Sequence, residues 1–182
     1  MRGLIVYESM FGSTRRVAEA IAEGLRTSGD VGVVRAAEVH QADLDGLDLL
    51  VVGAPTHMHG MPRPMTRSGT PEYVRKSGNQ LALEQGAALS TGVREWLTSL
   101  TISHVRGAAF DTRLRGPAAL TGRASRGIAT SLERHGVEVV IAAESFGVNK
   151  HGVLETGELK RAREWGRRLA IVAQSAVPAS AR

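Results

Sequence analysis

The chain has 182 residues and a mass of 19.4 kDa, a length that we expect to form one domain. It contains no cysteine, which excludes disulfides, thiolate metal sites and thiol catalysis. Its formal charge is +5, but the arginines are scattered along the sequence and no nucleic-acid-binding motif is present, so nucleic acid is not an expected partner.

The amino-terminal segment joins a strand, a small polar loop and an amphipathic helix. Residues 3–7 are an apolar run, and the helix is expected from Ser13 or Thr14 to about residue 27. The loop supplies hydroxyl groups and a glycine; its residues are Ser9, Met10, Phe11, Gly12, Ser13 and Thr14. Gly12 permits a tight turn, and the start of the helix presents free N–H groups. The pattern indicates an anion site, most naturally for a phosphate.

Two further features of this segment bear on its chemistry. The loop has no lysine, unlike the G-x4-G-K-S/T loop of nucleotide hydrolases, which suits a phosphate monoester that is bound and kept. Glu8 precedes the loop, and we expect its carboxylate to point away, toward the surface or an arginine. A structural alternative is that Ser13 only caps the helix.

The next elements lead to a second loop of interest. Residues 31–35 predict a strand, and residues 42–47 a helical turn or two. Residues 47–54 are the strongest strand, and their unbroken apolar run indicates burial on both faces of a parallel sheet. A loop follows at Pro55, Thr56, His57, Met58, His59 and Gly60.

The second half continues the alternation of helices and strands. Residues 63–85 are polar and give no firm prediction, whereas the apolar pattern predicts helices over 88–100, 118–135 and 157–173. Strands are predicted at 105–110 and 137–142. The expected loops are 111–114, which contains Asp111, Thr112 and Arg113, and 144–155.

Five strands that alternate with helices predict an α/β fold with a doubly wound, five-stranded parallel sheet and helices on both faces. If the strand order is 2-1-3-4-5, the switch point lies between the first and third strands. The loops after the first, third and fourth strands then meet at one edge of the sheet.

The ends of the chain complete the domain prediction. We expect a single domain over residues 1–176 and a frayed tail over 177–182. No apolar run of signal-peptide length precedes the first strand, and no stretch approaches the length of a membrane span. The expected location is the cytoplasm.

These features resemble the flavodoxin family. Residues 9–14 are similar to the family's phosphate loop T-x-T-G-x-T, residues 54–60 to its second flavin loop, and residues 157–166 to the closing helix of small actinobacterial flavodoxin-like proteins. The resemblance implies non-covalent FMN binding and electron transfer to a redox partner protein or a small-molecule acceptor. It implies that Ser9, Gly12, Ser13 and Thr14 hold the ribityl phosphate, and that residues 55–60 and 111–114 flank the flavin ring.

Two functions remain open, because the sequence also departs from the family pattern. Phe11 stands where the family has a middle hydroxyl, and the flavin loops carry His57, Met58 and His59 instead of Trp or Tyr. One function is an electron carrier or small flavin-dependent oxidoreductase. The alternative is a binding or regulatory module that has lost strong FMN binding. His57 and His59 alone make a poor metal site, so no metal is expected.

Overall fold

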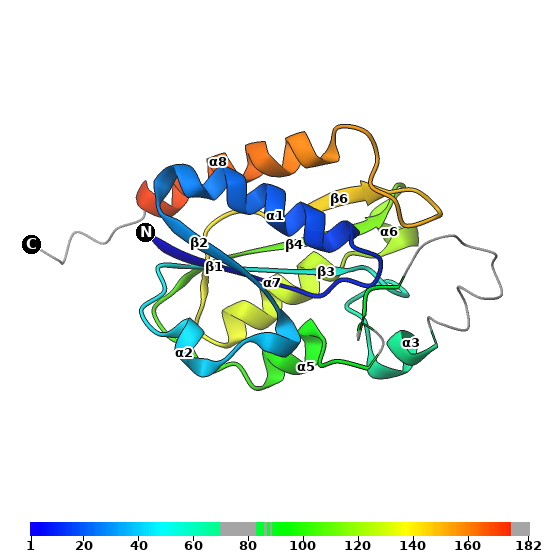
Figure 1. Cartoon of the computed structure of the whole chain (residues 1–182), viewed down its shortest axis with the longest axis horizontal. Coiled ribbons are helices and arrows are strands. Elements are labelled where there is room, and N and C mark those ends of the chain that lie inside the picture. The colour runs from blue at the N-terminus through cyan, green and yellow to red at the C-terminus, as the bar shows by residue number, and fades with distance from the viewer. Residues whose placement is uncertain (70–82, 86, 88, 176–182) are drawn as a thin grey trace, which may run out of the picture.

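The computed structural model describes residues 1–69, 83–85, 87 and 89–175. The tail predicted over 177–182, much of the segment 63–85 and the beginning of the helix predicted over 88–100 lie outside these residues. Within them, six strands form one parallel sheet in the order β2-β1-β3-β4-β5, with β6 paired to β4 (Figure 1). The strands are β1 (Arg2–Tyr7), β2 (Asp30–Arg35), β3 (Leu49–Pro55), β4 (Arg106–Leu114), β5 (Glu138–Val139) and β6 (Glu144–Val148). The predicted fold class and strand order are confirmed, and β6 is an addition.

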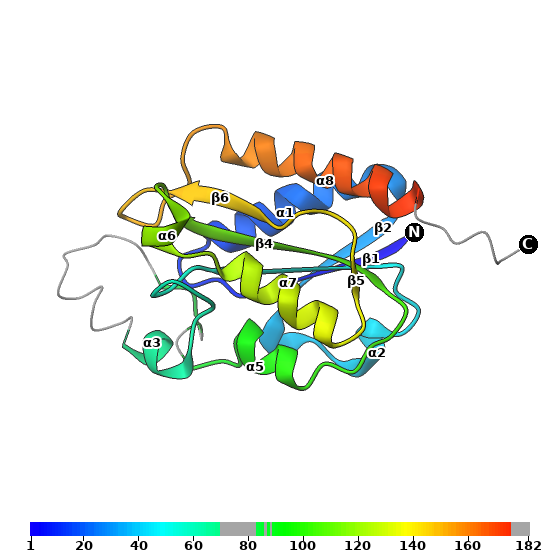
Figure 2. The same cartoon turned by 180° about the vertical axis from the view of Figure 1, so that it is seen from behind.

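Helices cover both faces of the sheet (Figures 1 and 2). Helices α1 (Ser13–Leu25) and α8 (Glu158–Ser175) lie on one face, and α5 (Val93–Thr98) and α7 (Ala124–Arg134) on the other. Shorter helical segments connect the strands; they are α2 (Gln41–Leu44), α3 (Pro64–Ser68), α6 (Ala118–Thr121) and the 3-10 turns Arg26–Ser28 and Ala36–Glu38. No described helix is long and apolar enough to cross a membrane.

The alternation of side chains along each strand divides the core into two layers. Ile5 and Val51 pack with Trp165 under α1 and α8, whereas Leu4 and Leu50 belong to the layer beneath α5 and α7. Every residue from Leu49 to Ala54 is buried, which confirms the prediction of a strand covered on both faces.

Three predicted elements differ from the structure. The predicted loop 111–114 is the second half of β4, because residues 144–148 form β6 and pair with residues 110–114. The predicted loop 144–155 is wrong over that span, and the predicted strand 137–142 is reduced to the two residues of β5. These pairings join segments far apart in the sequence, which local periodicity does not report.

The helices differ in length for local reasons. The helix predicted over 118–135 is two helices, separated at Gly122, whose φ of +75° favours glycine. The described part of the helix predicted over 88–100 begins at Val93, because carboxylates accept hydrogen bonds from the N–H groups of Gly92 and Val93.

Two glycines permit the close contact between α1 and α8. A Cβ on Gly24 would lie 2.2 Å from the carbonyl oxygen of Arg163, and a Cβ on Gly166 would lie 2.3 Å from that of Ile21. Both contacts are with backbone, which a side-chain rotation does not relieve. The two helices therefore pack backbone against backbone above β1 and β3.

This contact predicts that Gly166→Ala destabilises the fold. The added methyl group must push the helices apart, and overpacking of this kind costs about 1–3 kcal/mol. Gly127→Ala is the matched control, because a Cβ there meets only the Cε of Met61 at 3.4 Å and alanine favours a helix. Urea unfolding measures both variants; an unchanged midpoint for Gly166→Ala would contradict the packing.

Candidate functional site

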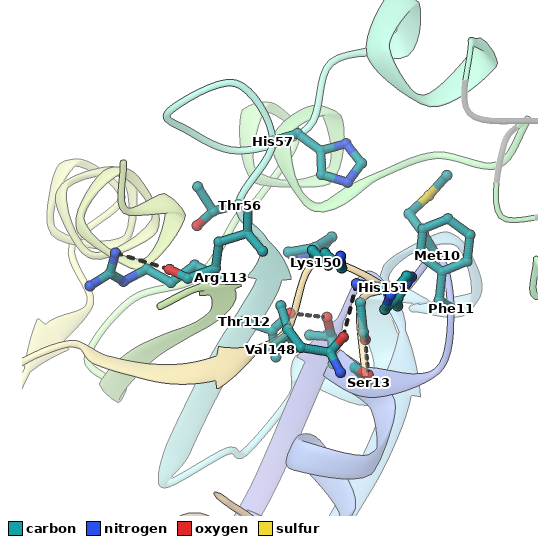
Figure 3. A pocket seen from close by; sticks show the side chains of 15 residues that line it. Met10, Phe11, Ser13, Thr56, His57, Thr112, Arg113, Val148, Lys150 and His151 are labelled. Carbon is teal, nitrogen blue, oxygen red and sulfur yellow. Dashed lines mark hydrogen bonds between the residues drawn. The ribbon is translucent and has the colours of Figure 1, made fainter. Parts of the chain in front are cut away.

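A pocket opens at the carboxyl edge of the sheet, where segments that follow β1, β3 and β6 meet the end of β4 (Figure 3). Its volume is about 170 Å³, and it is open to solvent. This is below the roughly 300–1,000 Å³ that is typical of small-molecule and cofactor sites. Its lining residues are Met10, Phe11, Ser13, Thr14, Pro55, Thr56, His57, Thr112, Arg113, Leu114, Val148, Asn149, Lys150, His151 and Gly152.

The loop after β1 turns into α1 without a side-chain cap. Gly12 has a φ of +85°, and its carbonyl oxygen accepts the first helical hydrogen bond from the N–H of Arg16, at 3.0 Å. The Ser9 hydroxyl oxygen accepts a hydrogen bond from the N–H of Gly12, at 3.0 Å. The first N–H groups of α1 therefore have no partner within the helix. The interpretation of Ser13 as a mere cap is wrong.

Two hydroxyls of this loop bind other walls of the pocket. Ser13 Oγ donates to the carbonyl oxygen of Gly152, at 2.6 Å, and Thr14 Oγ1 lies 2.8 Å from Thr112 Oγ1 (Figure 3). Thr14 and Thr112 are buried. The loop is thereby linked directly to the turn after β6 and to β4.

The loop after β3 contributes only part of its predicted residues to the pocket. His57 and Gly60 exchange backbone hydrogen bonds of 2.8 and 3.0 Å, which form a tight turn. Met58 and His59, at positive φ, occupy its tip and are exposed. Pro55, Thr56 and His57 line the pocket, whereas Met58, His59 and Gly60 do not.

The predicted residues of β4 face in opposite directions, as neighbours along a strand do. Asp111 is fully buried, and its Oδ2 accepts a hydrogen bond from the N–H of Ser125, at 2.8 Å, at the beginning of α7. Thr112 and Arg113 line the pocket. The Arg113 guanidinium donates to the carbonyl oxygen of Gly116, at 3.1 Å, and to Thr121 Oγ1. Asp111 therefore holds α7 in place, and its predicted loop position is wrong.

The turn after β6 forms a wall that the sequence analysis did not assign to the site. Asn149 Oδ1 accepts hydrogen bonds from the N–H groups of His151, at 2.9 Å, and Val153, at 3.2 Å. Gly152 has a φ of +74°. An asparagine followed three residues later by glycine is a turn signal, and it was available in the sequence. This turn brings the cation of Lys150 to the pocket.

A buried ion cluster lies beside the site and joins the end of β1 to α3 and α5. Arg67 Nη1 lies 3.6 Å from Glu8 Oε1, and Arg67 Nη2 lies 2.6 Å from Glu95 Oε2. Glu8 Oε2 also accepts a hydrogen bond from the N–H of Val93, at 2.9 Å. Glu8 thus pairs with an arginine, as expected, and burial raises the pKa of its carboxyl group although Val93 and Arg67 oppose that shift.

The same cluster affects His57. Burial lowers the pKa of His57, and the positive charge of Arg67 lowers it further. The imidazole is therefore neutral at neutral pH, where it has one donor and one acceptor nitrogen. Among the described residues, no three His, Asp or Glu side chains lie close enough to hold a metal ion.

Comparisons with known proteins agree on one kind of fold. A family model described as a flavodoxin domain matches residues 4–95. The structure is similar to a flavodoxin from the domain Archaea, with a TM-score of 0.65 and 20% identity over 96% of this chain and 99% of that one. It is also similar to oxidised Flavodoxin 1 from Bacillus cereus, with a TM-score of 0.63 and 15% identity over 97% and 99%. A comparison with curated proteins gives no match.

The ion cluster predicts a large difference between two arginines. Arg67→Gln leaves the buried Glu8 carboxylate without its cation, and breaking a buried pair costs about 3–5 kcal/mol. Arg115→Gln breaks a pair with Glu155 at 3.1 Å, but the Arg115 side chain is 80% exposed, so the cost is below about 1 kcal/mol. Urea unfolding compares the two variants. Equal losses in the free energy of unfolding would show that the buried pair stabilises the fold no more than the exposed pair does.

The environment of His57 predicts a pH effect with a defined sign. Because its pKa in the fold lies below the usual 6.5, the unfolded chain binds this proton more readily. The His57 contribution to stability is therefore present above pH 6.5 and is lost as the pH falls through 6.5 toward the lowered value. An NMR titration of the imidazole, assigned with His57→Gln, measures the pKa; a value of 6.5 or higher refutes this environment.

Proposed function

The chain belongs to the flavodoxin family, and on that premise we propose that it binds FMN without a covalent bond in the pocket at the carboxyl edge of the sheet and acts in electron transfer. The observation that carries the proposal is the uncapped start of α1, whose residues Ser13 and Thr14 line this pocket. When bound, FMN supplies the chemistry of accepting and returning electrons. The protein contributes binding, orientation and charge.

The phosphate end of the pocket suits a dianionic group. The first N–H groups of α1 and the positive end of its dipole favour an anion there. We assign this role to the backbone of Gly12, Ser13 and Thr14, with Ser9 Oγ fixing the turn through the N–H of Gly12. The Ser13 hydroxyl would exchange the Gly152 carbonyl oxygen for a phosphate oxygen. Lys150 adds a cation that the resemblance did not imply.

The part of the pocket that we assign to the flavin ring has no Trp or Tyr among its lining residues. We assign Met10, Phe11, Pro55, Thr56 and His57 to one side of the cofactor, and Thr112, Arg113 and Leu114 to the other, because all of them line the pocket. His57 in its neutral form can donate or accept a hydrogen bond at the ring. The Arg113 guanidinium favours negative charge near the ring, since its own hydrogen bonds go to uncharged acceptors.

A second function has a specific observation in its favour. The hydroxyls of Ser13 and Thr14 are already hydrogen-bonded inside the protein, and the pocket has no Trp or Tyr among its lining residues. A flavodoxin fold with this site permanently closed would act as a binding or regulatory module. Within the first function, an electron carrier and a small flavin-dependent oxidoreductase share the same site.

The absorption spectrum of the purified protein tests the proposal. The protein is mixed with FMN, passed through a gel-filtration column and scanned through the visible range. Flavin bands that elute with the protein support FMN binding. A colourless protein whose thermal unfolding is unchanged by FMN refutes it and favours the regulatory module.

The phosphate contacts predict that Ser13→Ala with Thr14→Val weakens FMN binding. A hydrogen bond to a charged group contributes about 1.5–3 kcal/mol, so affinity should fall about tenfold or more. Riboflavin lacks the phosphate, and its affinity should change little. Thr98→Val with Ser99→Ala is the matched control, because this exposed pair lies outside the pocket. Flavin fluorescence titration measures all three proteins; an unchanged FMN affinity removes these two hydroxyls from the phosphate site.

A further inference from the structure

Cations gather near the pocket. Four segments there, residues 9–18, 55–69, 112–132 and 145–154, contain nine of the 23 Lys and Arg residues and none of the 18 Asp and Glu residues. Acidic residues therefore outnumber basic ones in the remainder of the chain. Carboxylates flank these segments in the sequence at Glu8, Glu19, Asp111, Glu133, Glu144 and Glu155, and Glu84 pairs with Arg15. The arginines that seem scattered in the sequence gather at the carboxyl edge because each segment follows a parallel strand.

Most of these cations are not neutralised by a neighbouring carboxylate. Arg67 is buried in its ion cluster, and Arg15 pairs with Glu19 and Glu84. The described residues place no carboxylate against the other cations of the segments except Arg115, whose pair with Glu155 leaves its side chain 80% exposed. Within the part of the chain that the structure describes, the cations of these segments without an ion pair are Arg16, Arg63, Arg113, Arg123, Arg126 and Lys150.

Exposed apolar side chains stand among these cations. The exposed fractions are 83% for Met58, 72% for Leu120, 49% for Leu114 and 41% for Val153. Contacts join the segments that carry them. His59 forms a backbone bridge with Gly122, beside Leu120, and the Arg115–Glu155 pair joins the end of β4 to the turn that carries Val153.

We call this rim the mouth surface and define it by four apolar residues, Met58, Leu114, Leu120 and Val153, and four cations, Arg113, Arg115, Arg123 and Lys150. Leu114, Arg113 and Lys150 also line the pocket, so the mouth surface borders its opening on the side of β4 and β6. Exposed apolar side chains within a charged border are typical of a protein-binding surface.

We propose that the mouth surface is the docking site of an acidic electron-transfer protein. A redox partner must bring its own centre close to the pocket, and this rim borders the opening. Cations from the segments 112–132 and 145–154 match a broad acidic surface, and the apolar residues provide area that a small anion would not cover. One electron then passes across the contact, so that one centre is oxidised and the other is reduced without any bond forming.

Electrostatics gives the docking a measurable signature. Opposite charges accelerate encounter and are screened by salt over about 10 Å at 0.1 M ionic strength. An acidic partner must therefore bind more tightly at low salt, whereas a basic protein must be repelled. The proposed electron-transfer role rests on FMN binding, but the docking itself can be measured without flavin.

The test measures binding of two probe proteins by isothermal titration at 20 mM and 300 mM NaCl. The probes are an acidic plant-type ferredoxin and the basic protein cytochrome c. We expect the ferredoxin to bind at least tenfold more tightly at low salt and cytochrome c not to bind. Arg115→Glu with Arg123→Glu should weaken ferredoxin binding at least tenfold. Arg167→Glu with Arg168→Glu, an exposed pair on α8, is the matched control and should keep most of the affinity.

Each other outcome overturns the proposal. Equal losses of ferredoxin affinity in the two charge-reversal variants would show that the net charge of the protein alone attracts the ferredoxin. Binding of a single-stranded oligo-dT as tight as that of the ferredoxin, with the same dependence on Arg115 and Arg123, would show a polyanion surface instead of a protein site. Flavin retention is measured separately, by the absorption spectrum. A failure of FMN binding is thereby distinguished from a failure of docking.

Discussion

The site depends on one constraint: β1 lies between β2 and β3, and all three strands run in the same direction. Parallel strands end at the same edge of a sheet, and the chain reverses its direction of winding at β1. The loops after β1 and β3 must therefore separate and leave a crevice between them. The start of α1 lies in that crevice because the helix follows β1 after a short loop. The pocket is a consequence of the strand order.

Buried polar contacts hold the walls of this pocket in place. Glu8 and Arg67 join the end of β1 to α3 and α5, and Asp111 joins β4 to the beginning of α7. Thr56 Oγ1 accepts a hydrogen bond from the N–H of Ala124, at 2.9 Å, beside that contact. Each carboxylate binds the N–H of a helix start, where its negative charge is stabilised. These groups support the site and leave its interior to His57, Thr112 and Arg113.

The sequence predicts the parts of this arrangement that depend on neighbouring residues. The loop 9–14, the helix after it and the buried strand 49–54 are local patterns, and the doubly wound parallel sheet follows from the alternation of strands and helices. Pairing between β4 and β6 joins residues more than 30 positions apart, so the length of β4 and the direction of Asp111 were not predictable from periodicity. The turn at Asn149 and Gly152 was visible as a turn, but only the fold places it against Ser13. The collection of arginines at one edge was hidden for the same reason.

The central claim is that the start of α1 holds the phosphate of a bound flavin. A fluorescence titration of the unmodified chain with FMN and with riboflavin tests it most directly, because the two ligands differ only in that phosphate. The account predicts that FMN binds at least tenfold more tightly, which corresponds to about 1.4 kcal/mol. Equal affinities for the two ligands would contradict it.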